Sequence, residues 1–246
     1  MGNFFTVEVK PTIAASKQAL AAFADGDLLF DWAAFDIPKG ANRLLNVSVI
    51  SRGPDGSGQS HAMNLYFAKT LNSGANAPGS LGTIHATANG TGYQNHLIGA
   101  CTLEETDQVT GSDILTVHGI AGHGARMAGP NLVLQGEPDS GTNVGYDKLY
   151  VGGISLDGTP SFASTVQCDG IQATSQSGLL VKTTSALTTL DKGDVLHDED
   201  DRLLGTVKSI TDAENIVMTA NLANATVNNK DVYCLNPIRL LLQFEG

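Results

Sequence analysis

The chain of 246 residues is long enough for one large β domain or two smaller ones, and 41% of its residues are hydrophobic. Only 16% are charged, whereas glycine occupies 28 positions, a composition typical of short strands joined by tight turns. The formal net charge of −11 argues against binding nucleic acid or an anionic membrane surface, because both need clustered lysine and arginine. We therefore expect no nucleic-acid or membrane partner.

Alternation of apolar and polar residues predicts strands along most of the chain. The clearest strands lie at residues 5–9, 45–49, 63–67 and 238–244, with clusters of Gly, Asn and Pro between the runs. Residues 12–24 are rich in Ala, Lys, Gln and Leu, and both a short helix and an irregular loop fit this composition. Many short strands between turn clusters predict a mainly β protein, and we expect a jelly-roll-like β-sandwich.

A change in composition near residue 166 divides the chain. Long Gly- and Asn-rich loops precede it, and short, closely spaced strands follow it. These later strands are expected at residues 178–182, 193–197, 203–210 and 215–219, with a hairpin loop at 211–215. We predict that residues 166–236 form a small β-barrel-like module.

The final alternating run belongs with the first domain in this scheme. Pro237 fixes φ and removes a donor where a chain leaves one element and starts another. We therefore predict that residues 1–165 form the β-sandwich and that 237–246 return to it as a final strand. An inserted module leaves and re-enters through neighbouring points, so Cys168 and Cys234 should be spatial neighbours.

A cluster of carboxylates is the strongest candidate for a ligand site. His197 is followed by four acidic residues up to Asp201, and Asp191 and Asp194 lie just upstream. Such oxygen ligands suit calcium, but the spacing is not that of an EF-hand loop, and its glycine and distal glutamate are missing. We instead predict an exposed turn, in which replacing Asp198 and Asp200 with Asn changes the melting temperature little.

Other chemistry-bearing residues are isolated. His118 and His123 lie five apart in a glycine-rich stretch without a third ligand nearby. Cys101, Cys168 and Cys234 form no C-x-x-C motif and predict buried free thiols. Phosphate-loop and nucleophile-elbow motifs are lacking, although a triad dispersed along the chain stays open. The sequence thus predicts no catalytic, cofactor-binding or metal-binding residue, and we expect a protein that is not an enzyme.

Four stretches resemble virion structural proteins of tailed bacteriophages, particularly marine phages that infect cyanobacteria. They are Phe30–Gly40, Leu65–Lys69, Tyr146–Ile154 and Gly193–Val207. The resemblance extends over most of the chain and implies a virion component, made in the host cytoplasm, that decorates or stabilises the capsid. Shell proteins of these phages usually contain a long spine helix, and this chain has no matching helical pattern, which favours a decoration or accessory protein.

The resemblance implies the major capsid protein or other virion proteins as partners. Low charge combined with apolar alternation predicts a homo-oligomer, with a trimer as the favoured form. The loops at residues 53–60 and 72–80 are candidate contact arms. Two alternatives stay open: a carbohydrate-binding or adhesin-like β-sandwich that displays Trp32 and tyrosines on a platform, and a tail or baseplate component of the same kind of virion.

Overall fold

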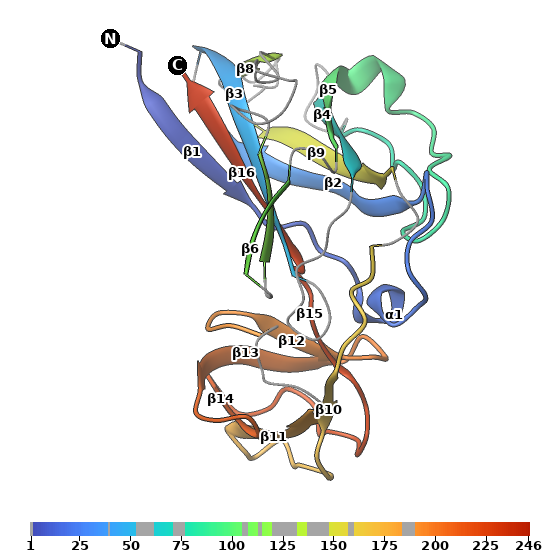
Figure 1. Cartoon of the computed structure of the whole chain (residues 1–246), viewed down its shortest axis with the longest axis vertical. Helices are drawn as coiled ribbons and strands as arrows, with labels where there is room; N and C mark the ends of the chain where they lie inside the picture. The colour runs from blue at the N-terminus through green and yellow to red at the C-terminus, as the bar shows by residue number, and fades with distance from the viewer. Residues whose placement is uncertain are drawn as a thin grey trace.

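Two β parts of unequal size make up the molecule, with the smaller part below the larger one in Figure 1. The computed structural model describes residues 2–38, 40–52, 62–70, 77–104, 108–112, 115–119, 132–136, 148–156, 160–183 and 190–246. The larger part is a sandwich of two antiparallel sheets, and the smaller part is a nearly closed, barrel-like sheet. This is the β-sandwich with a small barrel-like module that the sequence predicted.

The first sheet of the sandwich has the strand order β1-β16-β3-β7-β6, and β8 also pairs with β3. Its strands are β1 (Phe4–Val9), β3 (Gly40–Ser51), β6 (Gln108–Ser112), β7 (Leu115–Gly119), β8 (Leu132–Gly136) and β16 (Ile238–Glu245). The second sheet has the order β2-β9-β4-β5. Its strands are β2 (Leu28–Asp36), β4 (Met63–Lys69), β5 (Leu97–Leu103) and β9 (Lys148–Ser155).

The core of the sandwich lies between these two sheets. Period-two alternation turns Leu240, Leu242 and Phe244 of β16 inward, where each is at most 1% exposed. They belong to one apolar cluster with inward residues of the second sheet, such as Phe30 and Phe67. Burial of this apolar surface is the main favourable contribution to folding of the sandwich.

β16 pairs with β1 on one side and with β3 on the other. Its register places Leu242 opposite Val7 of β1 and opposite Val47 of β3. The predicted pairing of the final strand with the first sandwich is therefore confirmed. The wider division into domains 1–165 and 166–236 stays a prediction.

The segment between β1 and β2 contains little regular structure. A helix, α1, spans only Ala15–Gln18, and irregular chain follows it up to Asp27. A second short helical element, η2, spans Gln94–His96. Residues 12–24 thus combine the helix and the irregular loop that the sequence left open.

The module is a six-stranded antiparallel sheet with the order β10-β11-β14-β13-β12-β15. Its strands are β10 (Val166–Cys168), β11 (Gly178–Thr183), β12 (Val195–Asp198), β13 (Leu203–Ile210), β14 (Asn215–Met218) and β15 (Val232–Cys234). The predicted hairpin loop joins β13 to β14, and Asp212 accepts a hydrogen bond from the N–H of Glu214 at 2.9 Å. A separate apolar cluster fills this sheet.

The two ends of the module meet at a seam. A bridge between Gln167 and Asp231 brings β10 beside β15, and the Cys168 N–H donates to the carbonyl of Lys230 at 2.8 Å. Cys168 and Cys234 lie on these two strands, belong to the same apolar cluster and are free thiols. The chain therefore enters and leaves the module along adjoining strands.

Gly153 of β9 gives a test of packing in the sandwich. A Cβ atom there would lie 2.3 Å from Cε1 of Phe30, a ring with no exposed surface and little room to move. We expect Gly153→Ala to destabilise the protein by about 1–3 kcal/mol, because overpacking forces side chains or backbone to shift. Gly178→Ala is the control, since the nearest atom there is Ile216 O at 4.0 Å. Equal melting temperatures for the two variants would contradict this account.

Candidate functional site

Side chains from distant parts of the chain meet at the junction between the sandwich and the module. Arg52, at the end of β3, forms an ion pair with Asp194, which precedes β12 in the module. Their side chains are only 11% and 12% exposed. Burial works against the charge of Arg52, but the Asp194 carboxylate outweighs it and raises the pKa of the guanidinium. This ion pair joins the two parts.

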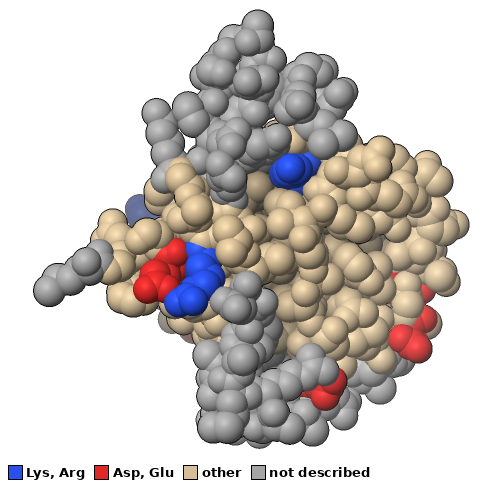
Figure 2. Space-filling view, turned by 90° about the horizontal axis from the view of Figure 1, so that it is seen from above, with Lys and Arg blue, Asp and Glu red and all other residues tan. Residues whose placement is uncertain are grey.

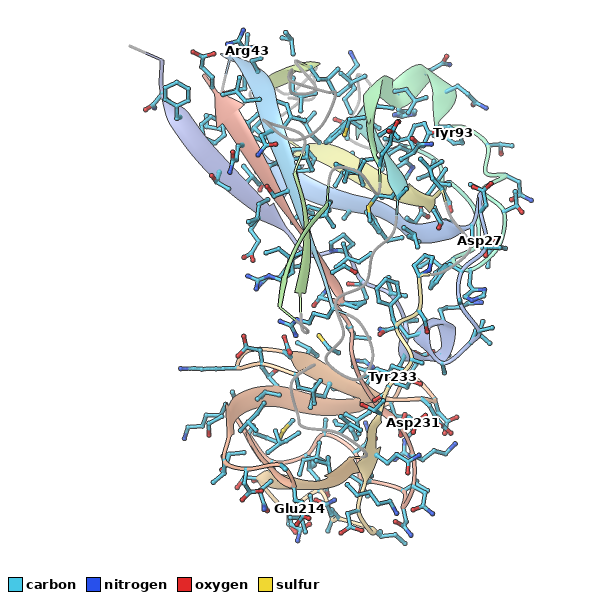
Figure 3. The ribbon with its side chains drawn as sticks, in the orientation of Figure 1. Asp27, Arg43, Tyr93, Glu214, Asp231 and Tyr233 are labelled. Carbon is cyan, nitrogen blue, oxygen red and sulfur yellow. The ribbon has the colours of Figure 1, made fainter. Side chains whose placement is uncertain are left out.

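Two side-chain amides add neutral hydrogen bonds at the same place. Gln18 of α1 is 3% exposed, and its Nε2 donates to the carbonyl of Cys234 at 2.9 Å. Asn236 Nδ2 donates to the carbonyls of Lys10 at 3.1 Å and Pro11 at 2.9 Å. The segment after β1 is thereby bound to the chain that leaves the module. Figure 3 shows Asp231 and Tyr233 on this side of the module and Glu214 at its far end.

A small cavity lies at the junction. Its volume is about 30 Å³, and its lining includes Gln18, Arg52, Ser164 and Tyr233. One water molecule needs roughly this much space, whereas sites for organic ligands usually measure about 300–1,000 Å³. The junction is therefore a packed contact, with a geometry suited to holding two parts in fixed orientation.

The sequence predicted an exposed acidic turn at residues 197–201, and this prediction is wrong for Asp198. Asp198 is 1% exposed, and its Oδ1 accepts hydrogen bonds from the N–H groups of Asp200 at 3.1 Å and Arg202 at 2.9 Å. This carboxylate holds together the turn between β12 and β13, whereas the Asp200 side chain is 56% exposed. Alternation along β12 is the physical reason, because it directs Leu196 and Asp198 to the same buried side.

Other acidic side chains of this segment form ion pairs or hydrogen bonds with neighbouring segments of the chain. Lys230 forms ion pairs with Glu199 and Asp200. Asp201 Oδ1 accepts a hydrogen bond at 3.0 Å from the N–H of Ser16 in α1. Burial opposes ionisation of Asp201, but hydrogen bonds from Ser16 outweigh it and lower the pKa of this carboxyl. Its contribution to stability is therefore present above the unfolded pKa of about 4 and is lost as pH falls below it.

The other residues singled out in the sequence are the three cysteines and the two histidines. Among the residues that the structure describes, no group of three or more His, Cys, Asp or Glu side chains is placed to hold a metal ion. Burial raises the pKa of Cys168 to about 11 and those of Cys101 and Cys234 to about 12, so all three thiols stay protonated at neutral pH. The pair His118 and His123 lies outside the residues whose side chains are described.

The part of the outer surface that the structure describes carries few charges at one end. Figure 2 views the sandwich from the side away from the module, and most of the described surface there is uncharged. At the other end, the module exposes Ile171, Leu180 and Val227, with Ile171 81% exposed. The predicted contact loop at 53–60 lies outside the described residues, and so does the 72–76 part of the predicted contact loop at 72–80.

Trp32 is held by the protein's own loop. Its indole Nε1 donates to the carbonyl of Gly79 at 2.8 Å, and its ring lies edge-on to Tyr93, with 6.2 Å between centroids. Asp31 beside it accepts a hydrogen bond from the Leu81 N–H at 3.0 Å. The tryptophan thus anchors a loop over the second sheet.

Comparisons with models of protein families, with curated proteins and with solved structures find no match. Over the described residues, no helix has the length and apolar character needed to cross a membrane. The architecture places the chain in the class of mainly β proteins, as a β-sandwich that carries a small barrel-like module.

Sequence reasoning missed Arg52, Gln18 and Asn236 as junction residues. The sequence contained a weak indication that Arg52 is paired, since it is one of only 14 basic residues and follows an apolar strand. Asn236 precedes Pro237, which was recognised as the point of return. Gln18 gave no signal, because helix-forming glutamines are usually exposed.

The Arg52–Asp194 pair gives a test of the junction. We expect Arg52→Gln to lower the free energy of unfolding by about 3 kcal/mol, because it leaves a largely buried carboxylate without its cation. Arg43→Gln is the matched control: it removes the Arg43–Glu245 pair, whose side chains are 48% and 32% exposed, and should cost at most about 1 kcal/mol. Urea denaturation measures both, and equal losses would show that the junction pair contributes no more than a surface pair.

Asp198 and Asp200 should differ strongly when replaced. Asp198→Ala removes a buried acceptor for two main-chain N–H groups, and we expect a loss of about 1–3 kcal/mol. Asp200→Ala removes an exposed carboxylate and should stay within about 0.5 kcal/mol of the parent. Thermal unfolding at neutral pH tests this, and equal melting temperatures of the two variants would contradict it.

Proposed function

We propose that this protein is a non-enzymatic structural component of a tailed-phage virion that decorates or stabilises the capsid surface through subunit contacts. Its partners are the major capsid protein or other virion proteins, and it acts as a homo-oligomer on the particle. The resemblance of four stretches to virion proteins motivates this assignment. The main structural support is the junction, where the largely buried Arg52–Asp194 ion pair joins the two β parts.

A rigid, charge-poor body suits such a role. Interfaces between proteins are depleted in charged residues at their centres, because burying an unpaired charge is costly. Over the residues that the structure describes, the sandwich end seen in Figure 2 has a surface of this kind. The acidic residues of the module, by contrast, are largely committed to its own turns and to the junction. We therefore assign the contact with the shell to the sandwich end.

The second candidate is a component of the tail or baseplate of the same kind of particle, where subunit contacts of the same type would also be needed. A glycan-binding role receives less support, because the Trp32 ring is only partly exposed and packs close to Gly152 of β9 and edge-on to Tyr93. An exposed aromatic platform would need this ring to be available for stacking.

Quantifying the protein in purified virions tests the proposal. We expect copies in a fixed ratio to the major capsid protein, and we expect the purified chain to bind particles that lack it. A few copies per particle, released together with tails, would instead assign the protein to the tail. Absence from particles would overturn the virion role, and selective binding on a glycan array would then support the adhesin-like alternative.

A further inference from the structure

The outer edge of β1 is an unpaired strand edge. Asn3 and Gly246 exchange two main-chain hydrogen bonds of 2.9 Å with each other. Because hydrogen-bonded and non-bonded pairs alternate in an antiparallel ladder, residues 5, 7 and 9 then bond to β16. The N–H and C=O groups of Phe4, Thr6 and Glu8 point away from it. Among the described residues, β16 is the one strand that pairs with β1.

This edge lacks most of the features that prevent strand edges from pairing. Its first four residues, Phe4 to Val7, are uncharged and strongly β-forming, and the Phe4 side chain is 69% exposed. Glu8 is neutralised locally by ion pairs with Arg239 and Lys10. The start of β2, the edge strand of the other sheet, is instead covered, since Leu28 bonds to the main chain of His85 and Ala86.

We propose that β1 pairs antiparallel with β1 of a second copy of this chain, about a twofold axis at Thr6. This inference rests on the homo-oligomer in the proposed function and specifies its interface. It joins the first sheets of two sandwiches into one continuous sheet. A twofold pairing gives a dimer, in place of the trimer expected from the sequence.

The register follows from the positions of the free groups. Pairing Thr6 with Thr6 of the second copy places Phe4 opposite Glu8 and Glu8 opposite Phe4, so all three outward residues pair and form about six main-chain hydrogen bonds. On the inner face, Phe5 lies opposite Val7 of the second copy. Both are only partly buried in the single chain and pack against the sandwich core, so pairing extends an existing apolar surface. A shift that placed Glu8 opposite Glu8 would bring like charges together.

A groove in the single chain matches this arrangement. It has a volume of about 380 Å³ and is lined by Glu8, Val9 and Lys10 on one side and by residues 31–34 of β2 on the other. In the proposed register, the first residues of the second copy run past Glu8 and Val9. Asn3 of the second copy then lies opposite Val9, on the inner face, so its side chain points toward the groove.

Cysteine cross-linking tests the register. Paired residues on the axis have Cα atoms about 5.5 Å apart, a separation that a disulfide spans. We expect Thr6→Cys to form a disulfide-linked dimer on mild oxidation. Phe4→Cys is the matched control, because the two copies of residue 4 would be separated by about 14 Å along the strands. Equal cross-linking of both variants, or none with Thr6→Cys, overturns the pairing. The parent chain, with its three free cysteines, sets the background.

A proline variant tests the edge without breaking the sheet. The Thr6 N–H points away from β16, so Thr6→Pro removes a hydrogen bond to the second copy only, whereas Thr6→Val retains it. By sedimentation velocity, we expect the parent and Thr6→Val to have the mass of two chains and Thr6→Pro that of one. Circular dichroism must show that Thr6→Pro keeps the parent's β signal.

The two proposals fail in different ways. A parent protein that sediments as one chain at tens of micromolar, or a folded Thr6→Pro that stays dimeric, overturns the β1 interface even if the protein is found on virions. A dimer sensitive to Thr6→Pro that is absent from virions supports the interface and overturns the virion role.

Discussion

The pairing of β16 with β1 and β3 is the interaction on which the rest of the structure depends. β16 fills the gap between two strands from the first part of the chain, and its inward residues supply the middle of the sandwich core. The chain must therefore return to its starting sheet after building the module. This requirement places the seam of the module at the junction, because the outgoing and returning segments have to adjoin there.

Polar groups at the junction fix orientation, and the apolar clusters supply most of the stability. The sandwich and the module each have their own apolar cluster. Between them lie the Arg52–Asp194 pair and the Gln18 and Asn236 amides, which require a defined geometry for their hydrogen bonds. A purely apolar contact would tolerate more sliding between the two parts, since hydrophobic burial is non-directional. These directional contacts therefore favour one orientation of the module relative to the sandwich.

Most of the fold could be predicted from local patterns, because sheet strands with one buried face alternate in sequence. β16 and the β13–β14 hairpin are examples, and Pro237 marked the return of the chain. The acidic turn could not be predicted in the same way. Asp198 becomes buried because β12 continues one residue further than expected, and the Ser16 partner of Asp201 is 185 residues away in sequence. Short sequence windows contain no information about such partners. The junction was missed for the same reason.

The order of the strands also affects how the protein forms during synthesis on the ribosome. β1 and β3 emerge early but cannot form their shared ladder until β16, which follows the whole module, has been made. The strands of the module are contiguous along the chain and can pair as they emerge. Until β16 is made, the facing edges of β1 and β3 in the nascent sandwich therefore stay unpaired, while the module already has all its strands. This interval is when pairing with another nascent chain competes most directly with correct closure.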